Sequence, residues 1–208
     1  MAKPPLIVLN GTANASVILL HGLGADGYDL APVVDALAIP NVRFILPHAA
    51  TRAVTLNGGY IMPAWYDIRS TDLTQQQDDT GFESSKLIID DLIATEIQQG
   101  IPSTRIILAG FSQGGALALY SGLSITPSLA GIAALSSYLP KLPGIHTNPP
   151  PIWMAHGKYD DIIPLSKCEA SWSATAHYVP ERHIYPMAHE ISIAEIADLR
   201  TWLLARLA

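Results

Sequence analysis

A serine between two glycines stands out as a candidate nucleophile. Ser112 is the centre of Gly110-Phe111-Ser112-Gln113-Gly114, which fits the pattern Gly-x-Ser-x-Gly. The apolar, β-branched run at 106–109 predicts a buried strand before it, and the Ala- and Leu-rich run at 116–120 predicts a helix after it. A strand, a glycine-flanked turn and a helix are together typical of a nucleophile elbow, whose strained backbone presents the serine hydroxyl at the carboxyl end of a sheet. The alternative is a glycine-rich turn with a surface serine, which these flanks favour less.

A serine hydroxyl is a weak nucleophile at neutral pH, so it needs a general base and a group that orients the base. Histidine suits the first role and a buried carboxylate the second. Downstream of Ser112, Asp160 and Asp161 follow a predicted strand at 151–155, and His189 follows another at 183–185. Ser, then Asp, then His is the chain order expected around such an elbow. We therefore predict a catalytic triad of Ser112, His189 and one of these two aspartates.

Four other histidines are weaker candidates for the base. His177 falls at the end of a predicted helix and His183 at the start of a strand, so both are interpreted as surface residues at the wrong edge of the sheet. His21 and His156 each begin a His-Gly pair at a strand end. We interpret these two as residues that stabilise turns by hydrogen bonds.

Acyl transfer through a serine also requires donors for the oxyanion. The glycine-rich run at 21–27 follows a predicted strand at 16–20, and glycines allow backbone N–H groups to approach a ligand closely. We predict that the backbone N–H groups of Leu23 and Gln113 form the oxyanion hole. Because the donors are backbone groups, the side chains at these two positions are expected to matter less than the geometry of the loop.

Strand and helix patterns alternate along the chain. Strands are predicted at 6–9, 16–20, 42–46, 106–109, 129–135, 151–155 and 183–185, and helices at 28–37, 82–98, 116–120, 166–176 and 192–207. This alternation predicts an α/β fold in a single domain, 1–208, with a mostly parallel central sheet and helices on both faces. Segment 48–81 has no clear period and carries several aromatic residues, so it is interpreted as an irregular loop that covers the substrate. For any single aromatic residue of this segment, packing onto the core is as good an interpretation as contact with the substrate.

Composition narrows the choice of partners and compartment. The 208 residues are 49% hydrophobic and only 14% charged, which provides a sizeable core. A net charge of −6 without any Lys/Arg run argues against nucleic acid as a partner. The single cysteine, Cys168, fits a reducing compartment. We see neither a signal-peptide pattern nor an apolar run of membrane-spanning length, so we predict a cytoplasmic protein without stable membrane insertion.

Several segments resemble the acyl-protein thioesterase/carboxylesterase family (the phospholipase/carboxylesterase group) of α/β-hydrolases. They are His21-Gly22-Leu23-Gly24-Ala25-Asp26, Asn57-Gly58-Gly59, Met62-Pro63-Ala64-Trp65-Tyr66-Asp67-Ile68, the extended elbow at 110–116, His156-Gly157-Lys158-Tyr159-Asp160 and Met187-Ala188-His189. The resemblance places the catalytic aspartate at Asp160 rather than Asp161.

The same resemblance implies roles in substrate binding. It supports Leu23 and Gln113 as oxyanion donors, and it implies that Leu23, Met62, Pro63 and Trp65 contribute to an acyl-binding cleft. The chain departs from the family pattern beside the histidine, where Ala188 and Glu190 stand in place of a glycine and a small residue.

We therefore predict a serine hydrolase of the carboxylic ester class. It would cleave an ester or thioester of a smallish acyl chain through an acyl-enzyme on Ser112, with no metal and no cofactor. The substrate classes considered are small esters, acyl-thioesters, acylated proteins and lysolipids, so lysophospholipase and acyl-protein thioesterase activities remain alternatives. A catalytically silent binding module fits less well with a complete triad. An exposed apolar lid would also offer a surface for a homodimer.

Overall fold

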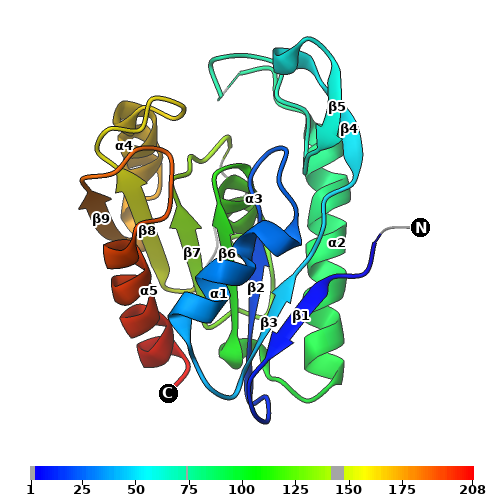
Figure 1. The fold of residues 1–208 in the computed structure, drawn as a ribbon, viewed down its shortest axis with the longest axis vertical. Coiled ribbons are helices and arrows are strands. Elements are labelled where there is room, and N and C mark those ends of the chain that lie inside the picture. Colours follow the sequence, from blue (N-terminus) through cyan, green and yellow to red (C-terminus); the bar gives the residue numbers. More distant parts are fainter. Residues whose placement is uncertain (1–2, 74, 142–147) are drawn as a thin grey trace.

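A seven-stranded sheet runs through the middle of the protein (Figure 1). The structure is a computed structural model that describes residues 3–73, 75–141 and 148–208. The strands of the sheet are β1 (Leu6–Leu9), β2 (Ala15–Leu20), β3 (Val42–Leu46), β6 (Ile106–Phe111), β7 (Gly131–Leu135), β8 (Ile152–Gly157) and β9 (Glu181–Tyr185). Their order in space is β1-β3-β2-β6-β7-β8-β9. Only β1, at one edge, runs antiparallel to its neighbour, so the prediction of a mostly parallel sheet is confirmed.

Helices cover both faces of the sheet. They are α1 (Ala31–Leu37), α2 (Asp79–Gln98), α3 (Gln113–Gly122), α4 (Leu165–Ala174) and α5 (Ile193–Arg206). Figure 1 shows α1 and α5 in front of the sheet, with α2 and α3 behind it. Side chains of α4 share a core cluster with those of α2 and α3, so α4 covers the same rear face. The result is a three-layer α/β domain.

Alternation along the strands produces two separate cores. Ile18 and Leu20 of β2 pack toward α2, α3 and α4, whereas Val17 and Leu19 pack toward α1 and α5. All four side chains are at most 2% exposed. A strand that is buried on both faces has no polar face, which is why these segments appear in the sequence as continuous apolar runs.

Segment 48–81 is more regular than the sequence predicts. It contains an antiparallel hairpin of β4 (Thr51–Val54) and β5 (Tyr60–Pro63), in which Val54 pairs with Tyr60. Gly58 and Gly59 have φ values of 65° and 81°, which a turn of this shape requires and which glycine adopts at little cost. The interpretation as wholly irregular chain is therefore corrected for the first half of the segment. The hairpin stands beyond one end of the main sheet (Figure 1).

Candidate active site

Ser112 occupies the sharp turn between β6 and α3. Its backbone has φ 53° and ψ −118°, a conformation that L-residues rarely adopt. Two contacts hold it there: the Ser112 N–H donates to the Leu135 carbonyl at 2.9 Å, and the Ser137 hydroxyl donates to the Ser112 carbonyl at 2.7 Å. Strained backbone of this kind costs about 1–3 kcal/mol and persists where the surrounding structure enforces it. The predicted elbow is therefore present in the fold.

The glycines of the elbow are required by close packing. A Cβ on Gly110 would lie 2.3 Å from the backbone of Gly114, and a Cβ on Gly114 would lie 2.3 Å from the Leu20 carbonyl oxygen. Both obstacles are backbone atoms, which cannot rotate away. Glycine thus lets the first turn of α3 pack directly against the ends of β2 and β6.

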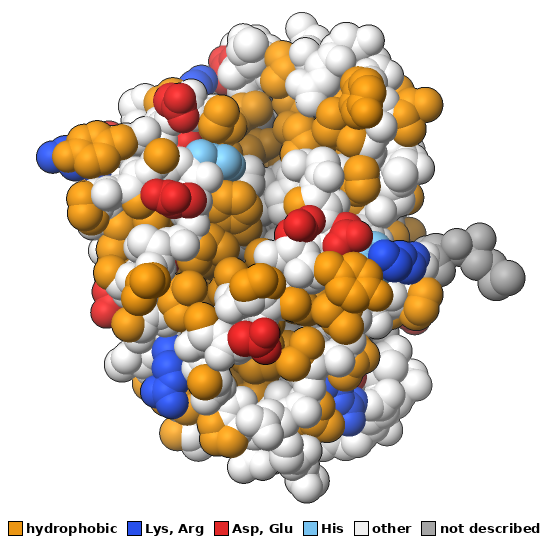
Figure 2. Space-filling model, in the orientation of Figure 1, with side chains coloured by type: hydrophobic (Ala, Val, Ile, Leu, Met, Phe, Trp, Pro, Cys, Tyr) orange, Lys and Arg blue, Asp and Glu red, His pale blue; other side chains and the backbone are white. Residues whose placement is uncertain are grey.

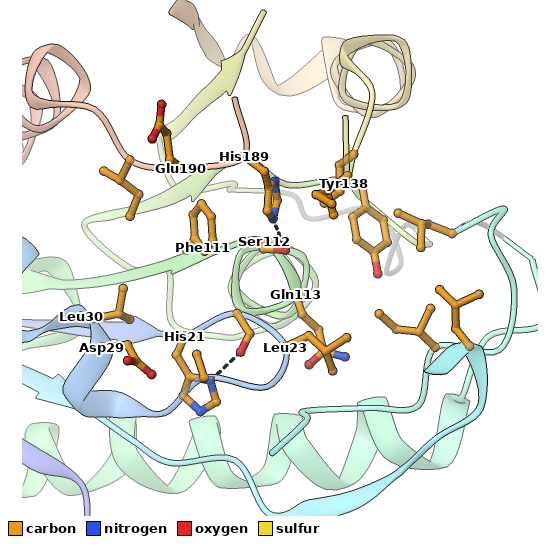
Figure 3. A pocket seen from close by; sticks show the side chains of 18 of the residues that line it. His21, Leu23, Asp29, Leu30, Phe111, Ser112, Gln113, Tyr138, His189 and Glu190 are labelled. Atoms are coloured by element: carbon orange, nitrogen blue, oxygen red, sulfur yellow. Dashed lines mark hydrogen bonds between the residues drawn. The ribbon is translucent and has the colours of Figure 1, made fainter. Parts of the chain in front are cut away.

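Ser112, His189 and Asp160 form a continuous hydrogen-bonded chain. His189 Nε2 lies 3.0 Å from Ser112 Oγ, and His189 Nδ1 lies 2.7 Å from Asp160 Oδ2. Figure 3 shows His189 directly above the serine. This arrangement fits a neutral imidazole in which Nδ1–H donates to the carboxylate and Nε2 accepts from the hydroxyl. The structure brings together the three residues that the sequence predicts, whereas Asp161 is exposed to solvent.

Asp160 is held rigidly by its own turn. Its Oδ1 accepts hydrogen bonds from the backbone N–H groups of Ile162, at 3.0 Å, and Ile163, at 2.8 Å. The buried His156 donates from Nε2 to the Ile163 carbonyl at 2.7 Å, and the same nitrogen lies 3.3 Å from Asp160 Oδ2. Burial lowers the pKa of His156, so its ring is neutral at physiological pH. These contacts fix the carboxylate that faces His189.

His21 plays a comparable part beneath the serine. Its Nδ1 donates to the Gly22 carbonyl at 2.8 Å, and its Nε2 accepts from the Ala49 N–H at 3.0 Å. Burial lowers the pKa of this histidine as well. His21 and His156 therefore stabilise turns, as the sequence indicates. His177 is exposed, but His183 is half-buried against the Trp153 ring, with centroids 5.0 Å apart, so it is not the surface residue expected.

The two predicted oxyanion donors lie at the serine. Leu23 and Gln113 both line the cavity around Ser112 (Figure 3). Among the described residues, the N–H groups of these two make no backbone hydrogen bond, so both are available to a ligand. The loop that carries Leu23 is fixed by a bond from the Gly24 N–H to the Pro63 carbonyl at 2.9 Å.

The Gln113 side chain departs from the expectation that its identity matters little. Its Oε1 accepts from the Trp65 N–H at 2.9 Å, and its Nε2 donates to the Tyr66 carbonyl at 2.8 Å, both in the buried interior. The side chain therefore joins the first turn of α3 to the chain that follows β5. A short side chain at this position would leave two backbone groups without partners.

A cavity of about 700 Å³ surrounds Ser112 and extends in two directions. We call one side the apolar arm; its lining residues Ile68, Leu73, Tyr138 and Ile163 belong to the rear-face core cluster or pack against it. We assign Leu56, whose N–H donates to the Ile68 carbonyl, its neighbour Asn57, and Ile162, which precedes Ile163, to the same arm. We call the other the acidic arm; it is lined by Asp29, Leu30, Val33, Phe111, Glu190 and Ile191. In Figure 3, Tyr138 lies to one side of Ser112, and Asp29, Leu30, Phe111 and Glu190 lie to the other. The arms belong to the two different cores, because Tyr138 and Ile163 pack with the rear-face cluster and Leu30 with the front-face cluster.

Three predicted substrate-binding residues have a supporting position instead. Met62, Pro63 and Trp65 are not among the residues that line this cavity. Trp65 is 1% exposed, and its Nε1 donates to the His21 carbonyl at 2.9 Å. Leu23 does line the cavity, and the same segment contributes Leu56 and Ile68 as wall residues. These apolar residues have no periodic pattern around them, so the sequence offered no signal by which to choose them.

The other groups that carry chemistry do not assemble a second centre in the described part of the chain. No cluster of three or more His, Cys, Asp and Glu residues is placed there to hold a metal ion. None of the described helices has the length and apolar character needed to cross a bilayer. Cys168 is buried in α4, and burial raises the pKa of its thiol, so it is no rival nucleophile.

Comparison with known proteins gives the family. The sequence model of the phospholipase/carboxylesterase family matches residues 6–206. The chain belongs to this family. It is 38% identical to acyl-protein thioesterase 1 of Neurospora crassa, over 99% of this chain and 92% of that protein. It is 36% identical to acyl-protein thioesterase 1 of Cryptococcus neoformans, over 93% of this chain and 92% of that protein.

Solved structures agree with the fold of the phospholipase/carboxylesterase family. The crystal structure of Zea mays acyl-protein thioesterase 2 superimposes with a TM-score of 0.84 at 26% identity, covering 98% of this chain and 99% of that one. The crystal structure of esterase PE8 superimposes with a TM-score of 0.82 at 27% identity, covering 100% of both chains. The prediction of an α/β-hydrolase fold is therefore confirmed.

Proposed function

We propose that this member of the phospholipase/carboxylesterase family is a serine hydrolase that uses Ser112 as nucleophile, His189 as general base and Asp160 as the group that orients the base. The bonds it cleaves are carboxylic esters and thioesters. The observation that carries the proposal is the hydrogen-bonded chain from Asp160 through His189 to a serine on strained backbone, at the centre of a cavity. A surface serine in a glycine-rich turn has no reason to meet all of these conditions.

The reaction follows from the positions of these groups. Ser112 Oγ attacks the acyl carbon while His189 Nε2 takes the hydroxyl proton, and the carbonyl oxygen becomes an oxyanion facing the N–H groups of Leu23 and Gln113. His189 then gives the proton to the departing alcohol or thiol, which leaves the acyl group on Ser112. A water molecule attacks the acyl-enzyme with the same proton transfers and releases the carboxylic acid. Each oxyanion donor of this kind contributes about 10²–10³ to the rate.

The apolar arm is the part of the cavity suited to the acyl chain. Its lining holds no charged side chain, and the Tyr138 hydroxyl bonds to the buried Tyr66 hydroxyl at 2.7 Å rather than to the cavity. Each methylene that enters such a site gains about 0.8 kcal/mol, or about fourfold in kcat/KM. An apolar acyl group is also what acyl-protein thioesterases, the relatives named above, would release. We extend the proposal to a cytoplasmic protein, because Cys168 is buried and unpaired.

The test compares kcat/KM for p-nitrophenyl esters from acetate to palmitate, with a palmitoyl thioester alongside. Ser112→Ala should lose at least about 10³-fold in kcat/KM for every substrate while keeping the fold, because nucleophilic attack is no longer possible. Ser173→Ala, at an exposed position on α4, is the matched control and should behave as the wild type. Labelling of the wild type by a fluorophosphonate, absent in Ser112→Ala, should accompany the loss. Undiminished turnover by Ser112→Ala would sink the proposal.

A further inference from the structure

Two residues with carboxylate side chains, Asp29 and Glu190, line the acidic arm of the cavity. Asp29 comes from the 3₁₀ turn Gly27–Leu30 after β2, and Glu190 directly follows His189. In Figure 3, Asp29 and Glu190 lie on the same side of Ser112 as Phe111 and Leu30, and the Glu190 carboxylate points away from Asp29. Segments more than 150 residues apart in the sequence thus place two negative charges at one opening. Figure 2 shows Asp and Glu side chains bordering the hollowed face.

Within the described residues, these two charges have no cationic partner. Asp29 accepts one hydrogen bond, from the Asp26 N–H at 2.7 Å, and no ion pair involves Asp29 or Glu190. The nearby Lys3 pairs instead with Asp26, at 3.6 Å. Both side chains belong to exposed residues of a chain with a net charge of −6, so the acidic arm presents a negative potential.

The arrangement of the reacting groups decides what enters this arm. The acyl chain and the leaving group extend from opposite sides of the carbon that Ser112 attacks. The apolar arm is suited to the acyl chain, and two carboxylates would oppose a second apolar chain on the other side. His189, which protonates the leaving group, is followed immediately by Glu190 and packs against Phe111 with ring centroids 4.8 Å apart. With the acyl chain in the apolar arm, the leaving group lies in the acidic arm.

We propose that the acidic arm is a leaving-group subsite that favours alcohols and thiols bearing a positive charge, such as an ammonium group, over neutral and anionic ones. This inference rests on the proposed function, because it assigns a substrate preference to the same site. Asp29 and Glu190 are the specificity-determining residues, and Leu30, Val33 and Ile191 provide the apolar lining beside the cation. An exposed charge pair is typically worth a factor of about 2–5, so the two carboxylates together predict a preference of about 5–20-fold.

The experiment compares two thioesters of the same shape. One is butyrylthiocholine, and the other is S-(3,3-dimethylbutyl) thiobutyrate, in which a neutral carbon replaces the quaternary nitrogen. Release of the thiol is followed with an aromatic disulfide reagent, which the buried Cys168 does not consume. The wild type should show a kcat/KM ratio of about 5–20 in favour of the cationic ester at low salt, falling as salt is added.

Charge-neutral variants identify the residues responsible. Asp29→Asn and Glu190→Gln should each lower the ratio by about 2–5-fold, and the double variant should bring it close to one. The neutral thioester reports any general effect on the neighbouring His189, and taking the ratio cancels that effect. Asp35→Asn, which removes an exposed charge from α1 outside the cavity, is the matched control and should leave the ratio unchanged.

Each other outcome has a clear meaning. A ratio near one in the wild type, or a ratio that the double variant leaves unchanged, would overturn the assignment of the acidic arm while the proposed function stands. If the wild type hydrolyses neither thioester and no simple ester, the proposed function itself fails, and this inference fails with it.

Discussion

Glu195 gives a test of the structure that does not depend on catalysis. It lies in the first turn of α5 with its residue fully buried, and neither carboxylate oxygen has a hydrogen-bond partner in the part of the chain described. Burial raises the pKa of Glu195 to about 8 from a usual 4.5. The folded protein therefore keeps a proton on this side chain at pH values where the unfolded chain has released it.

The sign and size of the effect follow from proton linkage. Between about pH 4.5 and pH 8 the folded state binds the extra proton, so the free energy of unfolding falls as the pH rises across this window. The difference between the pKa of Glu195 in the folded and in the unfolded state corresponds to a loss of at most about 5 kcal/mol in the free energy of unfolding. Glu195→Gln replaces the protonated carboxyl with a neutral side chain of the same shape that cannot titrate. We expect the variant to match the wild type at about pH 5 and to be more stable by several kcal/mol at about pH 8.

Urea unfolding at a series of pH values measures this directly. The midpoint of the wild type should decline with pH relative to that of Glu195→Gln, with unchanged slopes. Glu169→Gln, at an exposed position on α4, serves as the control and should run parallel to the wild type. A stability difference between Glu195→Gln and the wild type that is the same at both ends of the range would refute the reasoning. It would mean that the carboxyl is not held protonated by burial.

Two further predictions concern the site. Gln113→Ala should lower the free energy of unfolding by about 2–5 kcal/mol and reduce kcat, because it removes the hydrogen-bond partners of two buried backbone groups. Thermal unfolding measures the loss, with Gln98→Ala at an exposed position as the control. An unchanged melting temperature for Gln113→Ala would contradict this prediction. Ile68→Trp should lower kcat/KM for long-chain p-nitrophenyl esters by more than about tenfold and leave that for the acetate unchanged, because the larger side chain fills the apolar arm. Leu87→Trp, at an exposed position, is the control. An equal loss for all chain lengths would argue against the assignment of the apolar arm to the acyl chain.

The residues of the candidate triad could be proposed from the sequence because a parallel sheet simplifies the problem. The parallel strands β6, β8 and β9 all end at the same edge of the sheet, so Ser112, Asp160 and His189 needed only to follow these strands to lie close together. Apolar runs marked those strands well, since both faces of the sheet are covered. The positions of side chains within the loops were harder to predict. Trp65 turns inward to His21, and that choice depends on the fit between segments 44 residues apart.

The start of α3 illustrates a conflict that local preference cannot resolve. The sequence predicts helix only from 116, because Gly114 and Gly115 disfavour it, yet the helix begins at Gln113. The glycines are present because the Leu20 carbonyl and the Ser137 side chain leave no room for a Cβ. Gly114 and Gly115 therefore stand in the first turn of α3 because of close contacts with other segments, and these contacts can be seen only in the folded structure.

The turn that holds Asp160 has a consequence for how substrate range can change. The amides that fix its carboxylate belong to Ile162 and Ile163, and these same residues form one wall of the apolar arm. Leu56 and Ile68, on the opposite wall, make no hydrogen bond to Ser112, His189 or Asp160 in the described part of the chain. Substitution of these two side chains can therefore change the shape of the pocket without moving a residue that holds the triad. Substitution of Ile162 or Ile163 would also shift the backbone amides that hold Asp160, and with them the position of His189. Changes in substrate range should therefore occur at Leu56 and Ile68 more readily than at Ile162 and Ile163.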